Sequence, residues 1–481
     1  MKCSNKSKSL GFVPILIFGV FLLNIFWQLS SGDFIQVGEG FGWDGQVYGK
    51  LSRNLLVELK ENGVPRNRID RLLPVSLVYF SLRLTHEGTT FSVAEVIQRY
   101  RLANCIMLLL AICMFGVIAK KLSWSSGALY IACGACFFNF GFLKLPFYYS
   151  VLTDNFVLFL SVASLLAYLY RQTAVLAILT VLGAFSWSSA LLPNLAMLAF
   201  PRPKDGNLSD CPANGRTIAL VISIVTLALL CKIQNPFSFI WSKETIHLGL
   251  LGKCFVLILF YFLAWKRLLS FSIKNAIKQF HLTGGVVAIV VFVLVKVITA
   301  VLAAQFGRPE IGVVGVKEIL FDHILNRGLV DFGIFYVPHV VYFGPGILVM
   351  TLFWPEVSKA AQRFGIGFVA VLSLFLFCSL NSESRHLLYG LPFFAAALGT
   401  CLTERNLSLR VVFGFLFFCL LTSRAWLTIG NELESRYFSN FGPWIVSSHY
   451  RIELLLTIIS IVGLYSIFRC FQNNFLRELN N

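Results

Sequence analysis

Long apolar stretches separated by short polar segments dominate the pattern of this chain. A helix needs about 20 mainly apolar residues to cross a bilayer, and stretches of that order recur between Leu10 and Phe468. Because several are shorter than a full crossing, we predict about eleven to fourteen transmembrane helices. Two neighbouring stretches, Thr173–Trp187 and Ala190–Phe200, are candidates for one broken unit, because Pro193 interrupts the second. The pattern therefore predicts an all-α, polytopic integral membrane protein in which residues 1–481 form a single transmembrane domain.

Three longer polar segments interrupt this pattern, and the predicted topology places all of them on the outer side. They cover residues 31–101, 305–339 and 431–450. In the first, apolar residues recur at helical spacing, which predicts an amphipathic helix over Val47–Lys60 that lies in the membrane interface. Pro74 begins a second apolar piece that is too short to span. We therefore expect a long first outer loop that carries interfacial helices.

Composition and charge agree with a membrane protein. Hydrophobic residues make up 57% of the chain and charged residues 13%, about half the charged fraction of a typical soluble domain. Lys and Arg gather in the predicted inner loops with little balancing acid, which is the positive-inside pattern. The net charge of +17 thus reports topology, and we exclude nucleic acid as a partner because no soluble domain interleaves basic and aromatic residues.

The two ends of the chain are both predicted to lie in the cytoplasm. Lys2, Lys6 and Lys8 precede the first apolar stretch, which has no clear small-residue cleavage site, so we predict an uncleaved first helix. An even number of crossings returns the C-terminus to the inner side, and Arg469 and Arg477 agree with that placement.

Asp44 is the first candidate for chemistry. It stands in Gly-Trp-Asp-Gly-Gln-Val-Tyr, in the long polar segment that follows the first apolar stretch. A carboxylate at this place is suited to act as a general base toward a hydroxyl group. Gln46 and Tyr48 offer hydrogen bonds of the kind that sugars need, and Trp43 offers a stacking surface. The alternative is that Asp44 caps the amphipathic helix that follows it.

A second acidic candidate, Asp154, opens the apolar stretch after Tyr148-Tyr149-Ser150-Val151-Leu152-Thr153. Acidic residues near membrane depth are usually functional, so we assign Asp154 a catalytic role and Tyr149 a place in substrate binding. Capping of the next helix by Thr153 or Asp154 is an equally weighted alternative.

Several cations on the predicted outer side are candidates for binding a phosphate. Arg68 and Arg71 stand just before Leu72-Leu73-Pro74, and Arg385 stands in Asn-Ser-Glu-Ser-Arg-His between two apolar stretches. Arginine suits bidentate contacts with phosphate, and lysine suits point-charge contacts. Lys296 and Arg424 lie in the outward parts of apolar stretches, where snorkelling to the interface is the alternative.

The remaining candidates are weaker. Glu383 is assigned to the site, although simple pairing with Arg385 would also explain it. His339 and Tyr342 lie at a predicted helix start on the outer side and are kept as substrate-binding candidates. Cys133-x-x-Cys136 lies within an apolar stretch without a second Cys or His pair at metal spacing, so we interpret it as helix packing. Nucleotide-binding, zinc-protease and hydrolase motifs are missing from the sequence.

Together these residues resemble the GT-C superfamily of multi-pass glycosyltransferases, especially its bacterial branch. The similar features are Trp43-Asp44-Gly45-Gln46 with Tyr48, Arg68-x-x-Arg71-x-Leu73-Pro74, Tyr148-Tyr149-Ser150 with Thr153-Asp154, Tyr342-Phe343-Gly344-Pro345, and Glu383-x-Arg385. The resemblance implies a polyprenyl- or dolichyl-phosphate sugar donor, a catalytic base at Asp44 and inversion at the sugar. Some members bind a divalent metal through acidic pairs. This loop has no acidic doublet to support one, so we assign no cofactor and a divalent metal stays an open alternative.

The leading hypothesis is a glycosyltransferase that moves a hexose or pentose from a polyprenyl-phosphate donor to a glycan, lipid or protein acceptor on the extracytoplasmic face. We expect it among the membrane lipids of a bacterial inner membrane. A transporter or flippase for lipid-linked glycans is the first alternative, although it should show inverted repeats and polar residues at mid-membrane. A glycan polymerase is the second, although its largest outer loop usually comes late in the chain.

Overall fold

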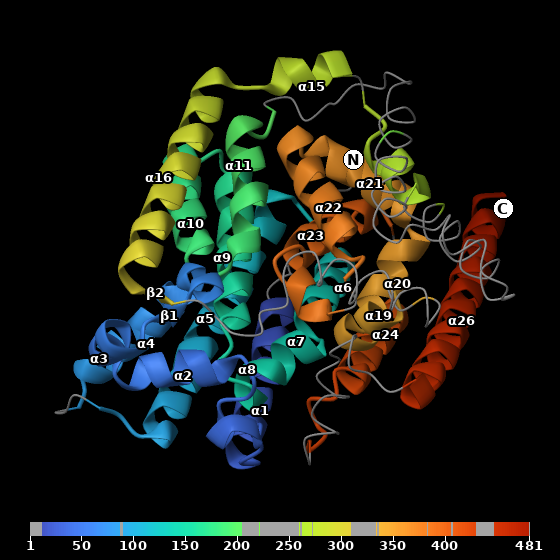
Figure 1. Cartoon of the computed structure of the whole chain (residues 1–481). Coiled ribbons are helices and arrows are strands. Elements are labelled where there is room, and N and C mark those ends of the chain that lie inside the picture. The colour runs from blue at the N-terminus through green and yellow to red at the C-terminus, as the bar shows by residue number, and fades with distance from the viewer. Residues whose placement is uncertain are drawn as a thin grey trace, which may run out of the picture.

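The computed structural model describes residues 12–86, 90–203, 221, 259, 262–271, 273–308, 333, 336–381, 383–405, 407–429 and 447–480. This part of the chain is mostly helical, as the sequence predicts (Figure 1). The helices of the N-terminal half are α1 (Phe12–Ser30), α5 (Val93–Lys121), α6 (Ser126–Phe137), α7 (Phe140–Leu143), α8 (Leu145–Tyr148), α9 (Asp154–Leu169), α10 (Thr173–Ala184) and α11 (Leu191–Ala199). Those that follow are α15 (Ile273–Gln279), α16 (Leu282–Phe306), α19 (Val337–Phe343), α20 (Pro345–Leu352), α21 (Trp354–Arg363), α22 (Ile366–Cys378), α23 (Leu391–Leu402), α24 (Leu409–Thr422) and α26 (Ser447–Asn480).

The largest hydrophobic core lies between the two halves of the chain. Helices α5, α6 and α9 pack against α23, while α11 packs between α16 and α22. Cys133 and Cys136 are buried in this core on α6 as free thiols, among apolar side chains. Exposed apolar side chains cover the outward faces of α16 and α26, where Val290, Val301 and Ile459 are each more than half exposed.

Two described helices, α5 and α16, are long and apolar enough to cross a membrane. The pair formed by Ser126–Phe137 and Phe140–Tyr148 is a third candidate span, bent by 71° at its break. The other apolar helices are shorter, and most residues of the predicted stretches Thr217–Leu230 and Leu248–Trp265 lie outside the described residues. The larger number of crossings stays a prediction.

The first long polar segment, residues 31–101, folds into short helices rather than the single amphipathic helix predicted over Val47–Lys60. Helix α2 (Gly45–Arg53) ends at Asn54, whose φ of −155° and ψ of 66° are not helical. A single turn, α3 (Leu55–Val57), and a π-helical turn, η2 (Glu58–Asn62), follow. The prediction of one continuous helix was therefore wrong, because the chain must bend to bring both halves of its apolar face onto one small core with Tyr79 and Tyr100.

A short parallel bridge connects this polar segment to the end of α16. Strand β1 (Val64–Pro65) pairs with β2 (Gly307–Arg308), with Val64 opposite Gly307. Next come a 3-10 helix, η3 (Arg66–Arg71), and α4 (Leu72–Arg83). In Figure 1, α2, α3, α4 and the bridge lie together at one end of the molecule, opposite α15. The predicted apolar piece after Pro74 is the body of α4.

Helices α10 and α11 pack beside each other and do not form one broken unit. The chain turns at Phe185–Trp187 and η4 (Ser188–Ala190), and Pro193 lies in the first turn of α11. Proline is tolerated in a first turn because the N–H that it lacks would have no helical partner there. Pro193 therefore does not interrupt the helix, contrary to our prediction, and the turn at Trp187 brings this residue to Arg71 in the first long polar segment.

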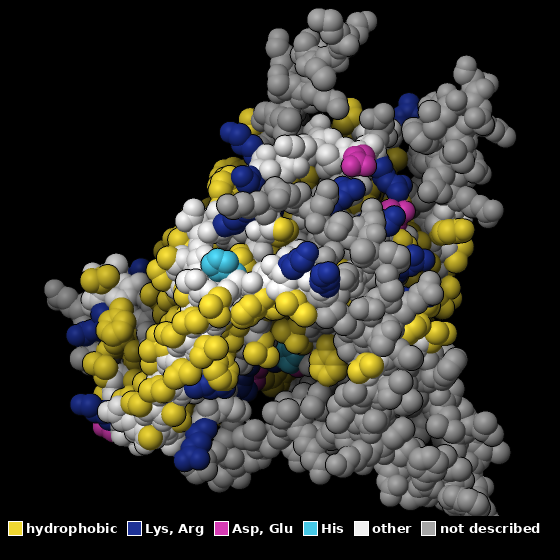
Figure 2. Space-filling view, turned by 90° about the horizontal axis from the view of Figure 1, so that it is seen from above, with side chains coloured by type: hydrophobic (Ala, Val, Ile, Leu, Met, Phe, Trp, Pro, Cys, Tyr) yellow, Lys and Arg dark blue, Asp and Glu magenta, His cyan; other side chains and the backbone are white. Residues whose placement is uncertain are grey.

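Figure 2 views the molecule from the α15 end. Lys and Arg side chains are frequent on this face and Asp and Glu side chains are scarce, beside a broad area of apolar side chains.

Candidate active site

The carboxylate of Asp44 lies between two guanidinium groups. Arg68 Nη2 is 2.9 Å from its Oδ1, and Arg385 Nη2 is 2.9 Å from its Oδ2. The side chains are shielded but not closed off, with exposed fractions of 22% for Asp44, 17% for Arg68 and 12% for Arg385. Asp44 precedes α2 without making a side-chain capping bond. Its oxygens bind arginines instead, so the capping alternative does not hold, and the role of Asp44 as a base stays a prediction.

Arg71 joins the cluster through Tyr48 and an aromatic face. Its Nη1 donates to the Tyr48 hydroxyl at 2.9 Å, and Arg68 Nη1 donates to the same oxygen at 3.0 Å. The Arg71 guanidinium carbon lies 4.0 Å from the ring centre of Trp187. Among the described residues, Arg71 forms no ion pair, and its Nε has no hydrogen-bond partner. Arg71 thus brings a positive charge that no carboxylate contacts.

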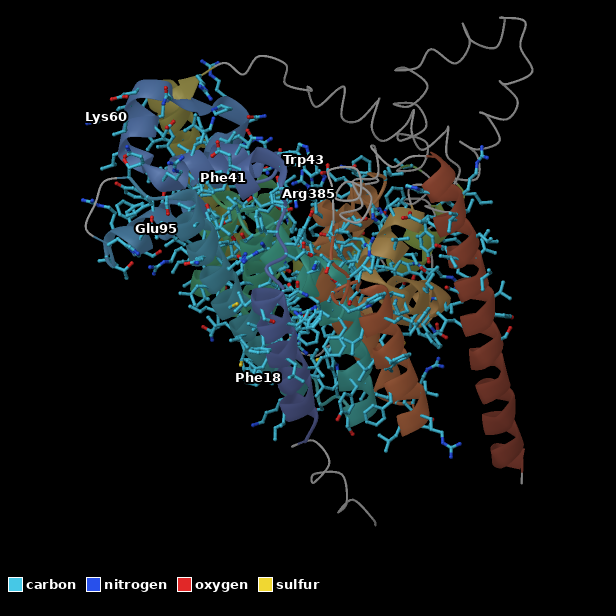
Figure 3. All side chains as sticks on the ribbon, turned by 90° about the horizontal axis from the view of Figure 1, so that it is seen from below. Phe18, Phe41, Trp43, Lys60, Glu95 and Arg385 are labelled. Carbon is cyan, nitrogen blue, oxygen red and sulfur yellow. The ribbon has the colours of Figure 1, made fainter. Side chains whose placement is uncertain are left out.

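Arg385 lies on a 3-10 helix, η6 (Ser384–Leu387), between α22 and α23. Its Nε donates to Glu383 Oε1 at 2.6 Å, so the predicted local pair exists together with the bond to Asp44. His386 lies 3.6 Å from Glu383 Oε2, bonds to the Asn381 side chain at 2.7 Å and packs 5.5 Å from Trp187. In Figure 3, Arg385 lies beside Trp43, although the two come from opposite ends of the sequence.

Tyr149 shapes the loop that carries Asp44. Its hydroxyl accepts a hydrogen bond from the Gly45 N–H at 3.1 Å, and its ring meets Trp43 edge-on at 6.3 Å. Gly42 has φ of +75°, and a Cβ on it would lie 2.3 Å from the Tyr149 ring. A side chain at position 42 would therefore both strain the backbone and displace the ring. These contacts hold the Asp44 loop in place.

Asp154 and Tyr342 lie deeper, within electrostatic reach of Arg385. Each is only 1% exposed. Both carboxylate oxygens of Asp154 and the hydroxyl of Tyr342 lack a hydrogen-bond partner among the described residues. Asp154 is the first residue of α9, and Thr153 makes no side-chain capping bond. Polar atoms left in this state need a partner such as water or a ligand group.

The charges of the cluster stabilise one another. Burial alone would raise the pKa of Asp44, but the neighbouring Arg385, Arg68 and Arg71 outweigh it and hold the pKa well below its usual range. Burial raises the pKa of the Tyr48 hydroxyl, which keeps the phenol protonated. Burial lowers the pKa of His386 to about 4, so this imidazole is neutral at pH 7.

Four of the predicted site residues lie apart from these contacts. Lys296 is exposed on α16, with its ammonium 5.7 Å from the ring centre of Phe292. His339 is buried, with its ring nitrogens 3.0 Å from Ser384 Oγ and 2.8 Å from Ser379 O. Arg424 follows α24 and lies 4.6 Å over the Phe140 ring. The side chain of Gln46 packs against Gly38, where an added Cβ atom would overlap the Gln46 side chain.

Two residues of the cluster were not among the predicted site residues. Trp187 appeared in the sequence only as the end of an apolar stretch, and His386 only as the neighbour of Arg385. A tryptophan at the outer end of an apolar stretch is usually an interfacial anchor. No motif in the sequence predicts that Trp187 packs over Arg71, because that contact depends on the turn between α10 and α11.

The cluster does not fit a metal ion. Both oxygens of Asp44 face guanidinium groups, whose positive charge disfavours a cation at the same place. Among the described residues, no three His, Cys, Asp or Glu side chains come together in a metal-binding group. Three arginines around one carboxylate suit an anionic ligand instead, because arginine matches the oxygens of phosphate.

Comparison with known proteins gives one structural similarity. No family model and no curated protein matches the sequence. The chain is similar to the crystal structure of the Archaeoglobus fulgidus oligosaccharyltransferase in the apo form, with a TM-score of 0.35 and 14% sequence identity. The similarity covers 84% of this chain and 55% of that one, so the chain spans about half the length of the archaeal protein.

Proposed function

We propose that this protein is a membrane glycosyltransferase of the GT-C type. It would transfer a hexose or pentose from a polyprenyl-phosphate donor to an acceptor on the extracytoplasmic face, with Asp44 as the general base. The observation that supports this most is the convergence of Asp44, Arg68, Arg71 and Arg385 from three separate parts of the chain. A carboxylate and several phosphate-binding cations are what such a transfer requires.

Arg71 is the first contact that we propose for the donor phosphate. Asp44 already occupies one nitrogen each of Arg68 and Arg385, whereas Arg71 has no carboxylate partner among the described residues. Trp187 holds the Arg71 guanidinium plane at 4.0 Å, which keeps its edge available. The polyprenyl tail would lie along the apolar surface of the helices.

The transfer itself would proceed in a single displacement. The acceptor hydroxyl attacks the anomeric carbon, the bond from that carbon to the phosphate oxygen breaks, and the acceptor proton passes to Asp44. The polyprenyl phosphate leaves with the bonding electron pair, and the three arginines stabilise its charge. Tyr48 orients two of these arginines through its hydroxyl oxygen.

The low pKa of Asp44 adds a condition to this mechanism. A carboxylate that two arginines stabilise is a weak base. The same arginines would bind the donor phosphate, so an incoming phosphate competes with Asp44 for their N–H groups. Donor binding therefore raises the basicity of Asp44 at the moment when a base is needed. Asp154 and Tyr342, which lack partners in the described structure, are proposed to bind hydroxyl groups of the sugar.

The test uses purified protein reconstituted in lipid. It is incubated with polyprenyl-phosphate hexoses and pentoses labelled in the sugar, and with envelope extract from a strain that lacks this protein. We expect one donor to pass its label to an extract component with release of polyprenyl phosphate, and no transfer by the Asp44→Asn variant. Transfer from no donor, combined with movement of the intact donor across the bilayer, would instead indicate a transporter.

A further inference from the structure

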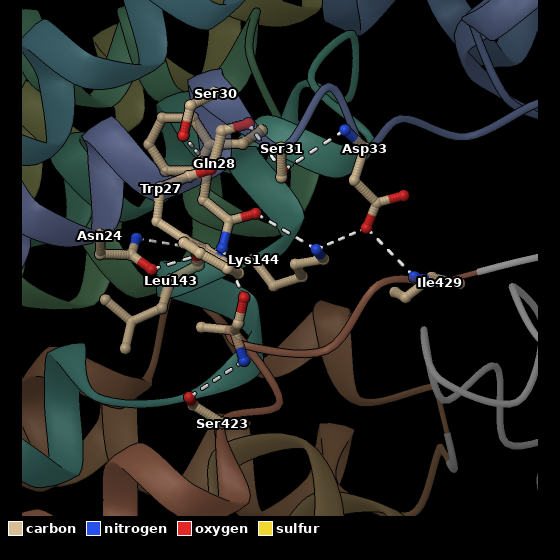
Figure 4. Close-up of polar contacts among 12 residues, drawn as sticks. Asn24, Trp27, Gln28, Ser30, Ser31, Asp33, Leu143, Lys144, Ser423 and Ile429 are labelled. Atoms are coloured by element: carbon tan, nitrogen blue, oxygen red, sulfur yellow. Dashed lines mark hydrogen bonds and ion pairs between the residues drawn. The ribbon is translucent and has the colours of Figure 1, made fainter.

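A second ion pair lies outside the Asp44 cluster, between the segments that build it. Lys144 Nζ is 2.6 Å from Asp33 Oδ2, and the two side chains are 1% and 4% exposed (Figure 4). Lys144 also donates to Gln28 Oε1 at 3.2 Å. Asp33 Oδ2 also accepts the N–H of Ile429 at 3.1 Å. The pair is thus nearly dry, and each ion has a second polar partner.

The network around this pair joins four distant segments of the chain. Gln28 belongs to the end of α1 and donates to Ala425 O at 2.6 Å, beyond the end of α24. Lys144 belongs to the α7–α8 break, where Asn24 donates to Leu143 O at 2.9 Å. Arg101 on α5 donates to Asp33 O at 2.9 Å. These contacts hold α1, α5, the α7–α8 break and the segment after α24 together.

Both ions stand at the start of a segment that leads into the Asp44 site. From Asp33 the chain runs to Asp44, and from Lys144 it runs to Tyr149, which contacts Gly45. A third contact lies between them, because the Ile35 N–H donates to Tyr148 O at 2.9 Å. The two segments are therefore joined at the ion pair, at Ile35–Tyr148 and at Gly45–Tyr149 in the site.

Stability alone does not explain why an ion pair occupies this place. Removing two charges from water costs several kcal/mol per ion, and apolar side chains of similar size often serve a buried position as well or better. A buried ion pair can specify how its two segments are aligned. Each ion accepts only a few geometries, and a wrong register leaves a charge without a partner. One such pair fixes how two segments lie against each other.

We propose that Asp33 and Lys144 are positioning residues that set the register of the Asp44 loop against Tyr149. They contact no proposed substrate atom and act through the loop. The inference depends on the proposed function only for its kinetic readout, because the position of the loop can be measured without any activity.

The test compares three variants in purified protein in lipid nanodiscs. Asp33→Asn/Lys144→Met removes both charges while keeping the side-chain sizes similar. Arg363→Met/Glu404→Gln removes an exposed pair, whose atoms lie 3.6 Å apart, and serves as the matched control. Trp43→Phe assigns the Trp43 signal among the nine tryptophans in fluorine NMR of 5-fluorotryptophan protein.

We expect the Trp43 signal to shift or broaden in the Asp33/Lys144 double variant and to stay unchanged in the control. Trp124, which is buried and donates to Thr400 Oγ1 at 3.0 Å, should keep its signal in both. With the donor found above, kcat should fall about 10- to 100-fold while KM for the donor stays unchanged.

Three results would overturn the inference. They are an unchanged Trp43 signal in the folded double variant, an equal change at Trp43 and Trp124, and a loss confined to KM. If the double variant does not fold, Gln28→Leu removes the second acceptor of Lys144, and the Trp43 signal should then shift or broaden relative to the unaltered protein. An unmoved signal in folded Gln28→Leu protein would also overturn the inference. Absence of transfer in the unaltered protein would defeat the proposed function and leave the NMR result standing.

Discussion

Two carboxylates of this protein meet cations in opposite ways. Asp33 has one lysine, almost no solvent exposure and a backbone N–H as its further partner. Asp44 has two arginines in contact, a third close by and 22% exposure of its side chain. A matched and dry pair has no capacity left for another ion. An exposed cluster with surplus cation has that capacity, so the first arrangement fits a fixed joint and the second a site for an anionic ligand.

The largest expected effect concerns Asp44 and tests whether this carboxylate is the base. Asp44→Asn keeps the size of the side chain and removes both the base and the charge. Transfer should fall by about 10²- to 10⁴-fold, since that is the usual contribution of a general base. The measurement is the rate of label transfer in reconstituted protein, with Tm as a check of folding. Glu39→Gln, an exposed acid earlier in the same loop, is the control and should transfer normally. Near-normal transfer by Asp44→Asn would remove the base from the mechanism.

The second effect concerns the buried ion pair of Asp33 and tests its contribution to stability. Lys144→Met leaves Asp33 buried without its cation, which costs about 3–5 kcal/mol. We expect a clear fall in Tm by thermal unfolding in detergent. Arg68→Met is the matched change at the other carboxylate, where Arg385 and solvent remain, and it should lower Tm much less while transfer is lost. Equal losses of Tm in the two variants would mean that the two sites do not differ as we describe.

The third prediction tests the positive charge of the Asp44 cluster that no described carboxylate contacts. Arg71→Ala removes the guanidinium that no described carboxylate contacts, and a hydrogen bond to a charged group is worth about 1.5–3 kcal/mol. We therefore expect KM for the donor to rise about 10- to 100-fold, with KM for the acceptor unchanged. Arg66→Ala, an exposed arginine of the same 3-10 helix, should leave both constants as they are. Equal effects of Arg71→Ala on donor and acceptor would argue against a phosphate contact.

The smallest effect is a pH dependence. The pKa of His386 is about 4 in the folded protein and about 6.5 in an unfolded chain. Between these values the unfolded state binds the proton and the folded state does not, so stability falls as pH falls. Asp44 stays ionised through this window because its pKa lies lower still.

His386→Gln should therefore flatten the fall of Tm between pH 6.5 and pH 4. The slopes are measured by thermal unfolding in detergent across this pH range. A slope that His386→Gln does not change would show that the imidazole is not held neutral by its surroundings.

The sequence predicted the helical class and many members of the site, because these depend on local signals. Helix-length apolar stretches show the class directly. Asp44, Arg68 and Arg71 all belong to the long polar segment after the first apolar stretch. The structure brings Asp44 into contact with Arg68 and Arg385, and Arg71 joins them through Tyr48. Their roles in transfer remain predictions.

The parts that the sequence did not predict depend on how distant segments pack. Asn54 breaks the expected amphipathic helix because both of its halves share one core. Trp187 reaches Arg71 through a turn that no local motif marks. Lys144 appears in the sequence as one lysine in an apolar stretch, and its partner Asp33 belongs to another segment. Lys296 and Arg424 were assigned by depth alone, which says nothing of the direction in which a side chain points.

The close packing of Gly42 against Tyr149 makes these two positions interdependent. The tyrosine ring fills the volume that any larger residue at 42 would need, and the φ of +75° adds a separate backbone penalty. Trimming the ring in Tyr149→Ala would cancel the first obstacle and leave the second. An engineer who wishes to widen this loop must therefore change the pair together, and glycine would still be favoured at 42 after the space has been made.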